Sequence, residues 1–203
     1  MDFISAKKII DDIYSNIDGH TISYKSRKNL FYTDKTLVYG EILLDSFYQI
    51  IKSVGPKENE VFYDLGSGVG KAVFAARLLF PFGKSTGIEL LSDIYQGSVQ
   101  AKNIFEKKYQ KQLLKKEKFK QTEFINKNIF DVDFSDGDVI FFHATCCPDQ
   151  LMVPISKKLE TLKKEARVII VTRYLYSDNF VLQKSETHQM GWGQALVNFY
   201  VKK

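Results

Sequence analysis

The chain has 203 residues, of which 44% are hydrophobic and 26% are charged, a balance typical of one soluble domain, residues 1–203, with a sizeable core. Its first residues lack the basic-then-apolar pattern of a signal peptide, and no apolar run approaches the roughly 20 residues that span a bilayer. We therefore expect no membrane partner and a cytoplasmic location, or a nuclear one if the source is a eukaryote. The adjacent Cys146 and Cys147 have no cysteine or histidine at metal spacing, so we expect neither a disulfide framework nor a metal.

The net charge of +5 mildly favours an anionic partner. Much of the excess lies in Lys107–Lys120, which carries seven lysines against one glutamate. A charge run of this kind is more often the solvated end of a helix than a binding site. Nucleic acid is the alternative partner that this stretch indicates.

Two helices are expected before the first strand, and together they form an N-terminal helical extension over residues 1–56. Apolar residues near helical spacing predict the first over about 4–17, with a loop after Asp18–Gly19. Thr33–Asp34 caps the second, which ends at Gly55–Pro56 just before the first strand. Glu41, an unpaired acid in this second helix, would reach a cationic ligand if the helix lies over the glycine-rich turn that follows.

A sheet core over residues 57–203 opens with an apolar strand at Val61–Leu65, a turn with three alternating glycines and an apolar helix. Such glycines let a ligand approach the main chain at the start of a helix. A phosphate-binding Walker loop needs glycine in place of Leu65 and Ser or Thr after Lys71, and the dinucleotide fingerprint needs two residues where only Val69 stands. The remaining pattern, acid-Leu-Gly-x-Gly-x-Gly, resembles the first motif of class I methyltransferases that use S-adenosylmethionine (SAM). A glycine turn that binds nothing is the alternative.

The next strand, Lys84–Glu89, ends in a carboxylate nineteen residues beyond Gly70. This is close to the interval expected of a βαβ unit whose second strand holds a ribose. Glu89 can accept hydrogen bonds from both ribose hydroxyls. The alternative role is an acid near the N-terminus of the helix predicted from about Asp93.

The third and fourth strands, predicted at Gln121–Ile125 and Asp138–His143, lead into further candidate ligands. In this architecture the segment that leaves the third strand faces an adenine, so Asn128 can read its exocyclic amine while Ile129 covers the ring. An ordinary Asn-rich turn is the alternative. The fourth strand is apolar enough to be central, and its carboxyl end, which continues to Thr145, should therefore open on the ligand crevice.

A helix after Pro148, a fifth strand at Arg167–Val171 and two strands over 179–203 complete the chain. Alternating strands and helices followed by a hairpin predict an α/β fold with a mostly parallel, seven-stranded sheet, an antiparallel last strand and helices on both faces. This is the Rossmann-like arrangement of class I methyltransferases.

With Tyr39-Gly40-Glu41, the Asp64–Gly70 turn and Glu89 in register, the chain resembles the catalytic domain of the disruptor-of-telomeric-silencing family. These are histone lysine methyltransferases built on a class I fold rather than a SET domain. The resemblance covers about residues 37–172 and implies SAM as cofactor, S-adenosylhomocysteine as product and a protein substrate. The cofactor-binding positions it implies are Glu41, Asp64, Gly66, Ser67, Gly68, Lys71, Glu89, Asn128 and Ile129.

Two motifs depart from the family pattern. Lys71 stands where the family has Gln after its last glycine, and His143-Ala144-Thr145 stands where the family has Asn-Asn-Phe. The residues that face the acceptor therefore differ. The resemblance implies the fold and the cofactor, whereas histone as the substrate does not follow from it.

Methyl transfer requires an uncharged nucleophile held in line at about 3 Å, and a lysine amine with a reference pKa near 10.4 must first lose its proton. We expect His143 to be the polar acceptor or base near that amine, with Thr145 and Tyr39 shaping the channel. A strand-end histidine bonded to backbone is the alternative for His143. The expected function is a protein lysine methyltransferase. The alternatives are a methyltransferase for a small molecule or RNA, and a SAM-binding module without catalysis.

Overall fold

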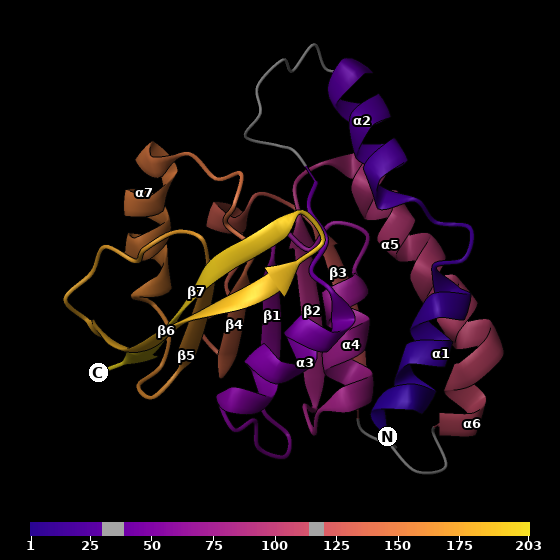
Figure 1. The fold of residues 1–203 in the computed structure, drawn as a ribbon, viewed down its shortest axis with the longest axis horizontal. Helices are drawn as coiled ribbons and strands as arrows, with labels where there is room; N and C mark the ends of the chain where they lie inside the picture. Colours follow the sequence, from indigo (N-terminus) through magenta and orange to yellow (C-terminus); the bar gives the residue numbers. More distant parts are fainter. Residues whose placement is uncertain (30–38, 114–119) are drawn as a thin grey trace.

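A computed structural model describes residues 1–29, 39–113 and 120–203 of the chain (Figure 1). One sheet of seven strands lies at its centre, in the order β3-β2-β1-β4-β5-β7-β6. Strands β1 to β5 pair in parallel, and β7 runs antiparallel to both β5 and β6. The bounds are β1 Val61–Leu65, β2 Lys84–Glu89, β3 Gln121–Asn126, β4 Val139–Phe142, β5 Arg167–Val171, β6 Phe180–Met190 and β7 Gly193–Lys202. The predicted mixed sheet is confirmed.

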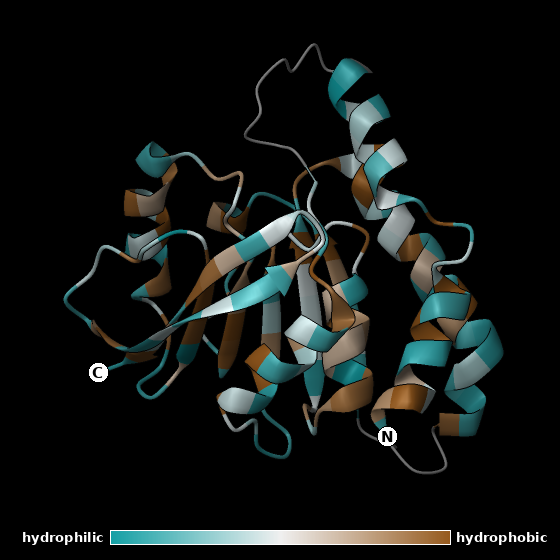
Figure 2. Cartoon of the chain, in the orientation of Figure 1, coloured by the Kyte–Doolittle hydropathy of each residue, from teal (hydrophilic) through white to brown (hydrophobic). Residues whose placement is uncertain are grey.

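Helices cover both faces of this sheet because alternate side chains of the central strands are buried on opposite sides. Phe62 and Phe141 belong to the core under α1, α3, α4 and α5, whereas Tyr63 and Ile140 pack with α7 on the other face. Figure 2 shows the hydrophobic colour concentrated on β4, β5 and parts of the helices. The helix bounds are α1 Phe3–Ile13, α2 Gly19–Asn29, α3 Leu44–Ser53, α4 Lys71–Leu79, α5 Ser92–Phe105, η2 Glu106–Gln110, α6 Lys111–Leu113, η3 Ile129–Asp131 and α7 Asp149–Leu159.

The topological switch point of the sheet is at β1, which pairs with β2 on one side and with β4 on the other. In open α/β sheets a ligand crevice lies outside the carboxyl ends of the strands at such a switch point. The ends of β1, β2 and β4 therefore place their following residues at one edge. In the described part of the chain, none of the helices is long and apolar enough to cross a membrane.

The helix predicted from the Thr33–Asp34 caps to Gly55–Pro56 begins later in the structure than expected. Helix α3 begins at Leu44, and residues 40–43 form an irregular segment. The expected caps Thr33 and Asp34 lie outside the described residues. Ile42 packs against the core from the irregular segment, so the apolar spacing before Leu44 arises from core contacts rather than from a helix. The segment that carries Glu41 thus reaches the crevice as a loop.

The loop predicted after Asp18–Gly19 was also wrong, because helix α2 occupies Gly19–Asn29. Asp18 accepts hydrogen bonds from the Thr21 amide at 3.1 Å and the Thr21 hydroxyl at 2.6 Å, which is the behaviour of an N-terminal cap. The helix is polar and has no wide apolar stripe, so hydrophobic periodicity did not reveal it. It lies alongside α5 (Figure 1).

Candidate functional site

Three glycines with left-handed backbone carry the chain from β1 into α4. The angle φ is +75° at Gly66, +57° at Gly68 and +87° at Gly70, and such angles strain a residue that has a Cβ. A Cβ on Gly66 would have no neighbouring heavy atom within 4 Å, whereas one on Gly68 would lie 2.1 Å from Cε2 of Tyr39. The turn is therefore open to a ligand at Gly66 and covered by an aromatic ring at Gly68.

Two carboxyl groups lie near the ends of β1 and β2: that of Asp64 is buried and that of Glu89 is half-buried. Glu89 accepts from the amides of Gly68 at 2.9 Å and Leu91 at 2.8 Å, and each of its oxygens keeps a lone pair for a ligand hydroxyl. Burial raises the pKa of Asp64 to about 8, with the charge of Glu89 as the second cause. Burial also raises the pKa of Glu89, against the backbone hydrogen bonds that lower it. Within the described residues Asp64 has no hydrogen-bond donor, so its carboxyl is available to a cationic ligand.

Tyr39, Glu41 and Lys71 form a polar cluster beside the glycine turn. The ammonium of Lys71 lies 2.5 Å from one oxygen of Glu41, and the hydroxyl of Tyr39 donates to the other at 2.8 Å. Burial, followed by the charge of Glu41, raises the pKa of Tyr39 well above its ordinary value, so the phenol is neutral. The three side chains border a cavity of about 30 Å³ together with Asp64, Gly66, Ser67 and His143.

A larger cavity of about 280 Å³ continues from the same place toward β2 and β3. Tyr39, Gly66 and His143 border both cavities. The larger one is also lined by Ile88, Glu89, Leu90, Leu91, Ile94, Asn128, Ile129, Phe130, Phe142, Cys146, Cys147, Pro148, Leu151 and Ile155. Its lining is mostly apolar with a few polar groups, which is typical of a small-molecule site. The structure thus brings together all the predicted cofactor-binding residues except Gly68, which lies under Tyr39 and borders neither cavity.

Asn128 and Ile129 line the larger cavity beyond Glu89. The side-chain oxygen of Asn128 accepts from the Phe130 amide at 3.1 Å and so caps the short helix η3. One lone pair of that oxygen and the side-chain NH₂ group stay available to a ligand. The two roles considered for Asn128 are therefore compatible. Its side chain closes an ordinary turn, and the residue also lines the cavity in which an adenine would lie.

His143 follows β4 and is half-buried between two distant parts of the chain. Its ring makes an edge contact with Trp192 at a centroid distance of 4.9 Å, and a Cβ on Gly40 would lie 3.3 Å from its Cε1. Its Nε2 has no hydrogen-bond partner among the described residues. Burial lowers the pKa of His143 to about 4, so the imidazole is neutral at pH 7. The nitrogen is also closed to solvent, so this neutral ring can accept a hydrogen bond only from a group that enters beside it.

Thr145 lines neither cavity. Its hydroxyl lies 3.0 Å from the hydroxyl of Thr172, which follows β5 and has a left-handed φ of +73°. A β-branched residue rarely adopts this conformation. The amide of Thr172 donates to the Leu196 carbonyl at 2.7 Å and extends the pairing of β5 with β7. Thr145 is therefore placed as a neighbour of the site rather than as part of its lining.

Sequence reasoning missed several residues that build the site. Trp192, in the connection between β6 and β7, covers His143. Tyr14, which follows α1, donates to the Val69 carbonyl at 2.8 Å, and the Lys71 ammonium lies 5.3 Å from its ring centroid. No sequence motif marks Trp192 or Tyr14 as a site residue, because each contacts the site from a segment that is distant in the sequence. Leu151 on α7 could have been anticipated, since the helix after a central strand often borders the crevice.

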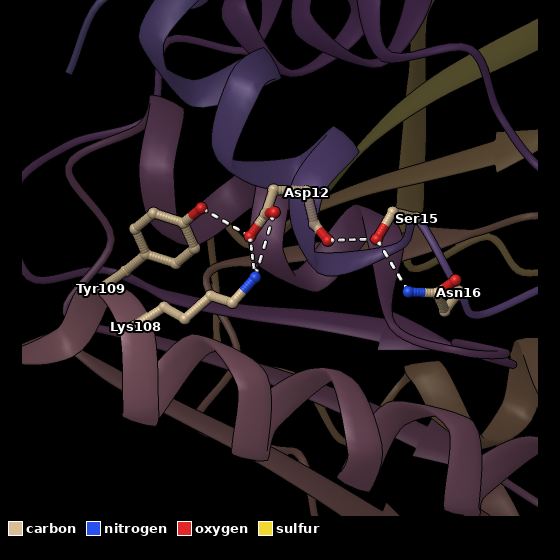
Figure 3. A network of polar contacts seen from close by, with 5 residues as sticks. All are labelled: Asp12, Ser15, Asn16, Lys108 and Tyr109. Carbon is tan, nitrogen blue, oxygen red and sulfur yellow. Dashed lines mark hydrogen bonds and ion pairs between the residues drawn. The ribbon is translucent and has the colours of Figure 1, made fainter.

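The lysine-rich stretch is partly tied to the rest of the fold. Lys108 lies 2.8 Å from Asp12, and the hydroxyl of Tyr109 donates to the same carboxylate at 2.7 Å (Figure 3). The ammonium of Lys120 donates to the carbonyls of Arg77 and Phe80. Residues 114–119 lie outside the described part. Two of the lysines therefore have structural roles, and the nucleic-acid partner stays a prediction for the others.

Several of the solved structures that resemble this chain are methyltransferases. An RNA methyltransferase from Salinibacter ruber, in complex with S-adenosyl-L-homocysteine, superposes with a TM-score of 0.57 at 18% identity, over 78% of this chain and 92% of that one. Magnesium protoporphyrin IX methyltransferase from Synechocystis PCC 6803, with bound SAM, gives a TM-score of 0.58 at 12% identity, over 97% and 90%. With the strand order given above, they confirm the predicted class: the chain has a Rossmann-like class I methyltransferase fold.

Sequence comparison identifies the family within this class. The sequence model described as "Histone methylation protein DOT1" matches residues 20–200, so the chain belongs to the DOT1 family. The match extends beyond residues 37–172, on which the resemblance was first based, and includes α2 and the β6–β7 hairpin.

Individual relatives match shorter stretches. The "Histone-lysine N-methyltransferase, H3 lysine-79 specific" of Debaryomyces hansenii is 38% identical over 86 residues, 42% of this chain and 7% of that protein. The Kluyveromyces lactis protein of the same name is 40% identical over 67 residues, 32% and 12%. The Dictyostelium discoideum protein of that name is 28% identical over 123 residues, 59% and 6%. The matched stretches thus span at most about an eighth of these relatives.

Proposed function

We propose that this chain is a SAM-dependent methyltransferase that transfers a methyl group to a lysine side chain of a protein. The observation that carries the proposal is the pair of joined cavities at the carboxyl edge of the sheet, with Glu41 and Asp64 at one end and Glu89 at the other. Membership of the DOT1 family and the printed activity of the relatives support a histone lysine as the acceptor. Such an acceptor would place the protein with chromatin, in the nucleus if the source is a eukaryote.

The donor would lie across both cavities. Its adenosine fits the larger, apolar one, where Glu89 accepts from the ribose hydroxyls and Asn128 and Ile129 contact the adenine. Its amino-acid end lies near Glu41, Asp64 and Lys71, where two acids attract the ammonium. The open main chain at Gly66 borders both cavities and so lies between the two ends, and Ser67 borders the smaller cavity while its hydroxyl is buried beside Gly87. Gly68 contributes indirectly, since its missing side chain makes room for Tyr39.

The residues at the junction of the cavities would receive the acceptor. Tyr39 and His143 border both cavities, so they lie where the methyl group would be presented. The lysine nitrogen attacks the methyl carbon, the bond from that carbon to sulfur breaks, and the uncharged thioether S-adenosylhomocysteine leaves. The lysine ammonium loses its proton to water before the attack, because only the neutral amine has a lone pair, and the product of the attack is a methylated ammonium.

Between the two roles expected of His143, the structure supports hydrogen-bond acceptor rather than base. A group with a pKa of about 4 is too weak a base to deprotonate an ammonium with a reference pKa near 10.4. The unpartnered Nε2 can instead align the amine by accepting its N–H. Tyr39 forms the channel wall, and Thr145 shapes the channel from behind through its contact with Thr172.

The proposal is tested by incubating purified protein and methyl-labelled SAM with nucleosomes, free histone octamers, RNA and a small-molecule extract in parallel. Label on a histone lysine is the expected result, and Asp64→Asn serves as the donor-binding control. Label on RNA or on a small molecule would identify the alternative class of methyltransferase. SAM binding with no label in any of the four fractions would indicate a binding module.

A further inference from the structure

The cavity at the amino-acid end of the donor site is too small for its expected occupant. Its volume of about 30 Å³ corresponds to about two water molecules, at roughly 10–15 Å³ each. The end of SAM that would lie there carries an ammonium, a carboxylate and an aliphatic chain. The larger cavity, by contrast, is already open at about 280 Å³. Side chains at the amino-acid end must therefore move when the donor binds.

The Lys71–Glu41 ion pair borders this cavity and limits its size. The ammonium and carboxylate lie 2.5 Å apart, and Glu41 is fixed from its other side by the Tyr39 hydroxyl. Lys71 is the more movable partner, since about a third of its side chain is exposed. It also borders a separate cavity of about 170 Å³ between α1, α3 and α4, which gives it space to turn.

The Lys71–Glu41 pair places one positive and one negative group where the amino-acid end of SAM, itself a zwitterion, would bind. If the ligand ammonium replaces Lys71 on Glu41, the Lys71 ammonium loses its partner in a partly buried position, which is unfavourable. The ligand carboxylate enters with the ammonium and supplies a new partner. Each charge of the protein thus keeps an opposite charge, whereas a ligand that lacks the carboxylate would leave Lys71 unpaired.

We propose that the Lys71–Glu41 ion pair holds the amino-acid end of the donor site closed and exchanges partners when the donor binds. The ligand ammonium takes Glu41, and Lys71 takes the ligand carboxylate. This inference rests on the proposed donor site and deepens it: Lys71 determines specificity for adenosine thioethers or sulfonium compounds that carry a complete amino-acid group. A ligand without that group enters the larger cavity and leaves the pair closed.

Titration calorimetry with three probes tests the exchange: S-adenosylhomocysteine, its decarboxylated analogue and 5′-methylthioadenosine, which lacks the whole amino-acid group. We expect the wild-type protein to bind S-adenosylhomocysteine at least tenfold more tightly than the decarboxylated analogue. In Lys71→Met the affinity for S-adenosylhomocysteine should fall at least tenfold, while the affinities for the other two stay within about twofold or rise. A charge-assisted hydrogen bond contributes about that much. Lys157→Met, which breaks an exposed ion pair with Glu160, is the matched control.

The outcomes separate the inference from the function on which it rests. Unchanged or tighter binding of S-adenosylhomocysteine by Lys71→Met would show that Lys71 is only displaced, and would overturn the exchange. An equal loss for all three probes would also overturn it, because the effect would not depend on the carboxylate. A wild-type protein that binds none of the probes would remove the donor site itself. If Lys71→Met does not fold, Lys71→Gln gives the same comparison, with a smaller expected loss.

Discussion

Asp64 lies one residue before the end of β1 and Glu89 is the last residue of the neighbouring parallel strand β2, and the charge of Glu89 adds to burial in raising the pKa of Asp64 to about 8. In the unfolded chain Asp64 ionises near its ordinary value of 3.8. The folded protein therefore binds an extra proton between about pH 4 and pH 8, and this contribution makes stability fall as the pH rises through that window.

Replacing Asp64 by Asn should stabilise the ligand-free protein above pH 4, because the amide needs no proton to remain uncharged. At pH 7 we expect a gain of at least about 1 kcal/mol, which corresponds to roughly 2–4 °C in the melting temperature of a domain of this size. Thermal unfolding at pH 5, 7 and 8 measures it. The gap between variant and wild type should widen with pH, and a constant or shrinking gap would contradict the raised pKa.

Donor binding to the wild-type protein should release protons at pH 6 to 7.5. The ligand ammonium beside Asp64 favours the ionised carboxyl and lowers its pKa in the complex. Affinity for S-adenosylhomocysteine should therefore increase with pH over this range, by up to about tenfold per unit. Calorimetry in buffers of different ionisation enthalpy counts the protons directly. Proton uptake, or none, would exclude an ammonium next to Asp64.

Gly68→Ala should destabilise the protein more than Gly66→Ala, although both glycines have left-handed backbone. A Cβ at position 68 would overlap the Tyr39 ring at 2.1 Å, whereas one at position 66 meets no atom within 4 Å. Backbone strain alone costs about 1 kcal/mol in each variant, and the overlap should add at least as much for Gly68→Ala. Chemical denaturation without ligand measures both. Equal losses would show that Tyr39 does not lie on the turn in solution.

His143→Ala should lower the rate of methyl transfer at least tenfold while the donor affinity changes little. The reason is that Nε2 aligns the acceptor amine, whereas the adenosine and amino-acid contacts come from other residues. Because the pKa of His143 is lowered to about 4, the wild-type rate should show no inflection near pH 6.5. An inflection there that His143→Ala abolishes would instead support the base role.

The sheet could be predicted from the sequence because each of its strands is a short run of residues with a recognisable apolar pattern. Arg167–Val171 and Val61–Leu65 are mostly buried and mostly apolar, and both were predicted with the bounds they have in the structure. Helix α2 could not be found in this way, since its surface is polar and its start depends on the Asp18 cap. Ile42 misled the prediction of the second helix, because a core contact resembles helical spacing when only the order of residues is known.

Only the site residues that belong to a sequence motif could be predicted from the sequence. Asp64, Glu89 and the glycines lie on one βαβ unit, so their spacing in sequence fixes their spacing in the fold. The contact of His143 with Trp192 depends on the last hairpin folding back across the sheet edge, and no local pattern encodes it. The ion pair of Lys71 with Glu41 likewise joins two segments through tertiary structure.

The position of Tyr39-Gly40-Glu41 has a consequence for any shortened version of this protein. A fragment that starts at residue 57 would keep the strands, Asp64 and Glu89, and so could still hold an adenosine. It would have no ring over Gly68, no acid opposite Lys71 and no backbone against His143. The smallest unit able to hold a methyl donor ready for transfer therefore begins upstream of the sheet.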